Sequence, residues 1–97
     1  MIEIQPERFR KIRYDAPVKH KVEIEIEATA AIDIFIVPVP EFDKWKRGSG
    51  NYGGDGFLRK KNLQLRVNIE DSQDGWYLIL ENRTDSVVVV RYEVYEV

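Results

Sequence analysis

The chain has 97 residues, which is enough for one hydrophobic core and too few for two. Its 43% hydrophobic and 11% aromatic residues indicate a folded globular protein, and its formal charge of −2 lacks the basic excess of nucleic-acid-binding proteins. The absence of cysteine excludes disulfides and thiolate metal sites, and no run approaches the roughly 20 apolar residues that cross a bilayer. We therefore expect one domain, residues 1–97, located in the cytoplasm, with no nucleic-acid partner and no membrane insertion.

Apolar and polar residues alternate with a period of two along most of the chain. This period places one face of a strand against a core and the other in solvent. The expected strands span residues 8–14, 18–28, 31–37, 62–69, 76–81 and 87–97. The strand at 31–37 is apolar on nearly both faces, as a central strand would be, and Pro38 ends it.

One short helix of about two turns is expected in the long loop that follows this proline. Pro40 falls in its first turn, acidic residues lie near its start, basic residues lie near its end, and Gly48 follows it. Phe42 and Trp45 lie three residues apart and share one face of this helix.

Six strands separated by turn-forming residues, without a long helical pattern, predict an all-β fold. We expect a jelly-roll-like antiparallel β-sandwich of about six to eight strands, with one short helix in a long loop. A partly open barrel is the alternative arrangement.

The sequence contains no convincing catalytic or metal-binding group. Residues 48–53 spell G-x-G-x-x-G, but they follow a helix instead of a strand, so they indicate a flexible surface loop and not a dinucleotide site. The single histidine, His20, lies in phase with core positions, on the face opposite a row of glutamates at positions 23, 25 and 27. We therefore expect no enzyme activity, no cofactor and no metal.

The loop 40–61 is the candidate recognition surface because it interleaves aromatic and basic side chains. Such side chains can stack on bases, sugars or the residues of a partner protein. The candidate binding residues are Trp45, Lys46, Arg47, Tyr52, Arg59 and Lys60. In the competing interpretation, Phe42, Trp45 and Phe57 turn inward and cap one end of the sandwich.

The pattern favours a protein-interaction or sensor module that uses this loop, and two alternatives remain. A small-ligand domain would stack a nucleotide or carbohydrate on Trp45 and Tyr52, with Arg59 or Lys60 contacting an anion. A self-assembling structural domain would form a homo-oligomer through the four valines at 87–90, which are apolar on both faces of their strand.

Residues 30–97 resemble a group of small prokaryotic β-sandwich domains of unknown function, which occur alone or beside TIR-type signalling domains. The matching landmarks are the strand at 31–36, the aromatic and basic turn ending at Gly48, the Gly53-Gly54 pair, and the Gly-Trp-Tyr strand that begins at Gly75. The closing segment is also similar, more weakly, to the Golgi-dynamics (GOLD) β-sandwich. Both resemblances imply a non-enzymatic interaction module with a GOLD-like or jelly-roll-like fold, and neither assigns a functional residue.

Overall fold

The computed structural model describes residues 1–17, 21–48, 50–69 and 74–97. The described residues form six strands and one short helical segment. The strands are β1 (Ile2–Ile4), β2 (Arg8–Tyr14), β3 (Lys21–Pro38), β4 (Asp55–Asn68), β5 (Trp76–Asn82) and β6 (Val88–Glu96). A 3-10 turn at Val39–Glu41 leads directly into helix α1, Phe42–Lys46. All described strand pairs are antiparallel, which confirms the predicted all-β class. The 3-10 turn and α1 confirm the predicted short helix.

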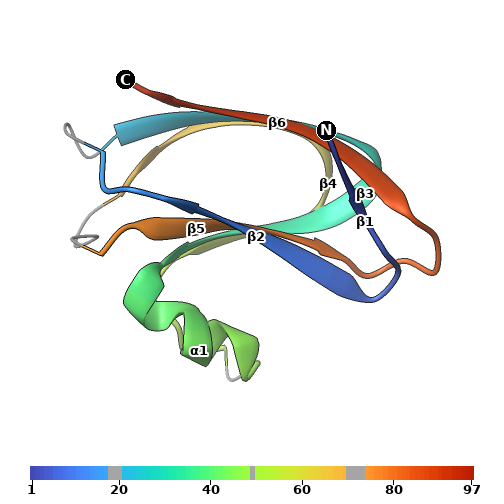
Figure 1. Ribbon diagram of the computed structural model, residues 1–97, viewed down its shortest axis with the longest axis horizontal. Coiled ribbons are helices and arrows are strands. Elements are labelled where there is room, and N and C mark those ends of the chain that lie inside the picture. The colour runs from blue at the N-terminus through green and yellow to red at the C-terminus, as the bar shows by residue number, and fades with distance from the viewer. Residues whose placement is uncertain (18–20, 49, 70–73) are drawn as a thin grey trace.

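Strand β3 organises the sheet because it is 18 residues long and pairs with three other strands. Its first half lies between β6 and β4, and its second half lies between β5 and β4. The strand curves at the middle, so its two halves belong to two facing layers (Figure 1). The two layers are therefore parts of one sheet that closes nearly into a barrel, as in the barrel alternative.

The prediction of two separate strands at 18–28 and 31–37 was wrong, because residues 21–28 and 31–37 both belong to β3; positions 18–20 lie outside the described residues. The pairing of β3 with β4 shifts register between Glu27 and Ile32, where the strand bends. Alanine and threonine occupy the bend at positions 28–31. Because the apolar side chains stay at even positions on both sides of the bend, the sequence pattern does not reveal that the two segments form one strand.

The main hydrophobic core fills the space between the two layers. Its side chains come from the inward face of every strand, in line with the predicted alternation. They include Ile4, Val22, Ile24, Ile26, Ile34, Ile36, Trp76, Leu78, Leu80, Val88 and Val90, all nearly inaccessible to solvent. Leu63, Leu65 and Val67 of β4 are only half-buried against this core.

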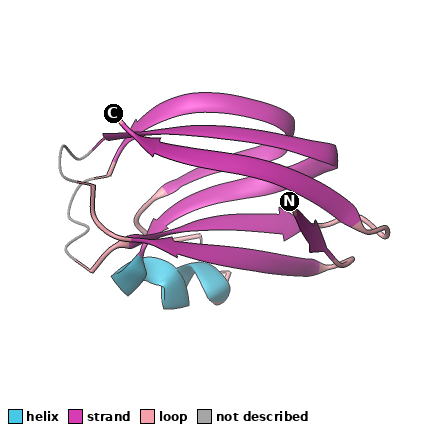
Figure 2. Cartoon of the chain, turned by 45° about the horizontal axis from the view of Figure 1, so that its top comes forward, coloured by secondary structure: helices cyan, strands magenta, loops and turns pink. Residues whose placement is uncertain are grey.

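A second hydrophobic cluster lies on the outer face of the β2–β5–β3 layer. Phe35, Val37 and Ile79 point outward from this layer and are covered by Phe42 and Trp45 of α1. Figure 2 shows the helix against this layer. The competing interpretation placed Phe42 and Trp45 against the body of the protein, and both side chains are indeed buried. They cover the outer face of the β2–β5–β3 layer, however, and not one end of a sandwich.

Strand β4 begins earlier than the sequence indicates, at Asp55 instead of near position 62. The predicted loop 40–61 therefore contains α1, a connection of eight residues at 47–54, and the first half of β4. Phe57 is half-buried against the main core, and Arg59 and Lys60 are exposed on β4. Strand β1 was not predicted; it pairs with the start of β6. No described helix is long and apolar enough to cross a membrane.

Asn82 links the end of β5 to β1 and to the turn before β6. Its side-chain amide donates hydrogen bonds to the backbone oxygens of Ile4, at 2.9 Å, and Ser86, at 2.7 Å. Its carbonyl oxygen accepts from the backbone N–H of Thr84, at 2.9 Å, and from the Thr84 hydroxyl, at 2.7 Å. Asn82 is fully buried, and these four bonds satisfy its whole side-chain amide; three of them are to backbone groups.

We predict that Asn82→Ala lowers the free energy of unfolding by about 3 kcal/mol, because the buried carbonyl of Ile4 loses its donor and the turn at Thr84 loses its acceptor. The control Ser86→Ala removes only an exposed hydroxyl contact with Asp85 and should change stability by less than about 0.5 kcal/mol. Urea denaturation of both variants measures the difference. Equal midpoints would contradict the role assigned to Asn82.

Candidate functional site

An aromatic cluster holds α1 against the sheet. The Trp45 ring lies 5.0 Å from Phe9, 5.3 Å from Phe35 and 5.8 Å from Phe42, measured between ring centroids. Phe42 also packs on Tyr77 at 5.2 Å, and the ammonium group of Lys11 lies 4.1 Å from the centre of the Phe42 ring. These edge-on and stacked contacts fix the short helix, which would be unstable alone.

Two glycines hold the connection after α1 close to its neighbours. The backbone N–H of Gly53 donates a 2.9 Å hydrogen bond to the Glu41 carboxylate, which also pairs with Lys44 at 3.2 Å. These partners lower the pKa of Glu41. At Gly54, φ is +135°, and a side-chain carbon would lie 2.3 Å from the backbone oxygen of Ile36. These two glycines thus serve close packing.

The helix, the connection and the neighbouring strand ends enclose an open pocket of about 370 Å³. We call it the aromatic pocket. Its lining includes Phe9, Phe35, Trp45 and Tyr52 as aromatic groups, and Glu7, Lys46, Glu81 and Arg83 as charged groups. Charges of both signs therefore surround an aromatic floor.

A buried carboxylate supports the polar end of this pocket. Asp33 is only 6% exposed, and its carboxylate accepts a 2.9 Å hydrogen bond from the backbone N–H of Arg59. The guanidinium group of Arg83 lies 3.9 Å from the other carboxylate oxygen. The pKa of the nearby Glu81 is raised overall, and burial is the largest cause. The charge of Arg83 opposes this rise, whereas the negative charges of Asp33 and Glu7 add to it.

Two residues with an unfavourable backbone conformation flank this polar end. Glu7 has a φ of 58° and Arg59 has a φ of 57°, in the left-handed region that favours glycine. Glu7 lies in the tight turn closed by the hydrogen bond from the Arg8 N–H to the Gln5 oxygen, at 3.2 Å. Such conformations cost roughly 1–2 kcal/mol each and often occur at functional sites.

The structure brings three of the six predicted binding residues into the aromatic pocket. Lys46 and Tyr52 line it, and Trp45 contributes a small part of its ring, since it is only 9% exposed. Arg47 is exposed beyond the pocket, where its side chain donates to the backbone oxygen of Asp43. The last two, Arg59 and Lys60 on β4, do not line the pocket.

Other pocket residues lie in, or directly beside, strands β2, β3 and β5, which the sequence analysis did not connect with the loop. Phe9 carried the one available signal, because it is an aromatic residue on the polar face of the alternation at 8–14. Glu81 and Arg83 gave no signal, since their position beside α1 depends on the pairing of β5 with β2 and β3.

His20, the one histidine weighed as a candidate ligand in the sequence, lies outside the described residues. Within residues 1–17, 21–48, 50–69 and 74–97, no group of three or more metal-ligating side chains could hold an ion. Neither the models of known protein families nor the curated proteins contain a match to this chain.

We predict that Trp45→Ala lowers the free energy of unfolding by about 3 kcal/mol, because it removes a buried ring from the aromatic cluster. Trp45 is therefore unsuitable as a neutral probe of binding. The control Leu58→Ala, at a position 60% exposed, should cost less than about 0.5 kcal/mol. If the two variants unfold at the same urea concentration, the helix is not anchored through Trp45.

Glu81 should make stability fall as pH rises. Its pKa in the folded chain exceeds the ordinary value of 4.5, so the folded chain binds this proton more tightly than the unfolded chain. The stability from the protonated form is complete below pH 4.5 and is lost as pH rises through the raised pKa. We predict that Glu81→Gln gains stability relative to wild type as pH rises from 4.5 through the raised pKa, in urea titrations at each pH. A difference that is constant with pH would contradict this effect.

Proposed function

We propose that the chain is a non-enzymatic binding module that captures a protein partner through the loop 40–61, with the aromatic pocket as the recognition site. One observation carries this proposal. Lys46, Tyr52 and the edge of Trp45 come from the loop. They converge on one open pocket with Phe9 of β2 and with Arg83, which directly follows β5.

The charge pattern of the pocket suits a segment of protein. A carboxylate of the partner would meet Lys46 and Arg83, and an amide or cationic group would meet Glu7 and Glu81. An aromatic or aliphatic side chain would cover the exposed parts of Tyr52 and its neighbours. Because the aromatic cluster anchors the helix in advance, little ordering entropy would be lost on binding.

The geometry gives less support to a nucleotide or a carbohydrate. The ring of Trp45 is surrounded by Phe9, Phe35 and Phe42, so it offers no free face on which a base or sugar could stack. The two predicted anion contacts on β4, Arg59 and Lys60, lie outside the pocket lining. Tyr52 remains the one half-exposed aromatic group among the predicted residues.

Self-assembly through the valine strand also receives less support. Val88 and Val90 are fully buried in the main core. At these positions β6 is paired with β1 on one edge, and the pairing with β3 begins at Val90 on the other. The exposed Val87 is a single side chain, which is ordinary for a protein surface.

The cytoplasmic location and the resemblance to the prokaryotic and GOLD sandwich domains stay predictions from the sequence. Both are compatible with a binding module. A module of this kind would take its biological role from the partner that the pocket selects.

Selection from a random peptide library displayed on phage tests the proposal. We expect wild type to enrich peptides that bind with micromolar affinity, and the double variant Lys46→Ala/Arg83→Ala to bind them about tenfold more weakly, as measured by fluorescence anisotropy. The matched control Lys21→Ala/Arg91→Ala removes the same charges from the outer face of the other layer and should bind normally.

Failure to enrich any peptide, or equal loss of binding in both double variants, would contradict a specific role for the pocket. A thermal-shift screen with nucleotides and sugars tests the small-ligand alternative. If a nucleotide or sugar stabilises wild type but not the Lys46→Ala/Arg83→Ala variant, the pocket binds a small molecule and the proposed protein partner is wrong.

A further inference from the structure

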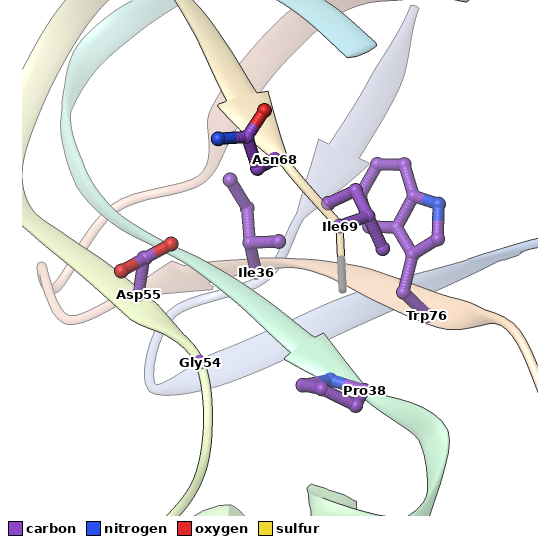
Figure 3. Close-up of a pocket in the computed structure, with 7 residues that line it drawn as sticks. All are labelled: Ile36, Pro38, Gly54, Asp55, Asn68, Ile69 and Trp76. Carbon is purple, nitrogen blue, oxygen red and sulfur yellow. The ribbon is translucent and has the colours of Figure 1, made fainter. Parts of the chain in front are cut away.

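A second pocket lies where the two ends of β4 approach the ends of β3 and β5 (Figure 3). We call it the mouth pocket. It has a volume of about 350 Å³ and is lined by Ile36, Pro38, Gly54, Asp55, Asn68, Ile69 and Trp76. None of these residues lines the aromatic pocket, so the two are separate cavities.

The floor of the mouth pocket is apolar and well fixed. Ile36 and Ile69 are buried, and Trp76 is only 1% exposed. The Trp76 ring stacks on Tyr14 with a centroid distance of 4.8 Å and an interplanar angle of 21°. An apolar group entering the pocket would therefore meet a preformed surface, which favours binding because little has to be ordered.

Asp55 places a carboxylate beside this apolar floor. It pairs with Ile36, so it occupies a position on the inward face of β4, where an apolar residue would be expected. Within the described residues, its carboxylate makes no hydrogen bond and no ion pair. Its negative charge reaches Tyr52, whose pKa is raised first by burial and then by Asp55.

The backbone fixes Asp55 in this position. Gly54 packs so tightly against the backbone of Ile36 that no side chain fits there, and β4 begins directly after it. Asn68, at the other end of β4, adds an amide to the pocket lining, and its side chain has no hydrogen-bond partner in the described part of the chain. A polar position that breaks the apolar pattern without a partner in the protein is typical of a functional site.

We propose that the mouth pocket binds a small organic cation that carries an ammonium group on a compact apolar body. The ammonium would pair with the carboxylate of Asp55 and donate to the amide oxygen of Asn68. The apolar body would contact Ile36, Ile69 and Trp76. A cation is favoured over an anion because, among the described residues of the lining, the one charged group is negative. Asp55 is exposed at the pocket opening, so an ammonium group could reach its carboxylate from solvent while the apolar body rests on the floor.

Nuclear magnetic resonance of the nitrogen-labelled full chain tests the proposal with 2-phenylethylammonium as the probe. The two tryptophan indole N–H signals report separately on the two pockets, and contacts with the Tyr14 ring assign the signal of Trp76. We expect a saturable shift of the Trp76 signal below about 10 mM probe, without a comparable shift of the Trp45 signal. The neutral analogue 2-phenylethanol should bind about tenfold more weakly, because it lacks the charge.

Asp55→Asn should weaken binding of the cation by about tenfold and bring it to the level of the alcohol. Asp43→Asn removes the same charge from the exposed face of α1 and should leave binding unchanged. The proposal is overturned if no saturable shift occurs, if the alcohol binds as tightly as the cation, or if Asp55→Asn binds normally. A shift of the Trp45 signal alone would place the probe in the aromatic pocket and would also overturn it.

Discussion

The rest of the structure depends on the second half of β3 being apolar on both faces. Ile34 and Ile36 point into the main core, while Phe35 and Val37 point away from it. Burying each such side chain contributes about 2 kcal/mol, so the outer pair also needs a cover. That cover is α1, a helix too short to persist alone, which is held in place by the face that it buries.

This cover also creates the aromatic pocket. The helix has five residues and covers Phe35, Val37 and Ile79, and the pocket beside it extends to Glu81 and Arg83. There the apolar cluster gives way to charged groups, and the connection after α1 passes alongside them. The same side chains therefore stabilise the fold and form the floor of the proposed recognition site. Removing Trp45 would damage both, whereas Lys46 and Arg83 act at the rim.

The sequence was sufficient for the fold class because period-two alternation and the shared face of Phe42 and Trp45 are local signals. The continuity of β3 was not predictable, since a bent strand and two short strands show the same alternation. The early start of β4 was hidden because Gly56 closely follows the Gly53-Gly54 pair, which is typical of a loop, and the basic residues at 59–61 interrupt the alternation. The candidate site was predicted only in part. Glu81 and Arg83 lie far from the loop in the sequence, and the pairing of β5 with β2 and β3 brings them next to it.

The segment from Tyr52 to Asp55 connects the two pockets, since Tyr52 lines one and Asp55 lines the other. Coupling between two sites requires a connecting element with two stable arrangements. Here the Gly53 N–H is bonded to Glu41, and Gly54 is packed against the backbone of Ile36 at a distance that excludes any side chain. These contacts define one arrangement of the segment. The two pockets are therefore held at fixed positions on one rigid scaffold, and binding at one should leave the affinity of the other unchanged.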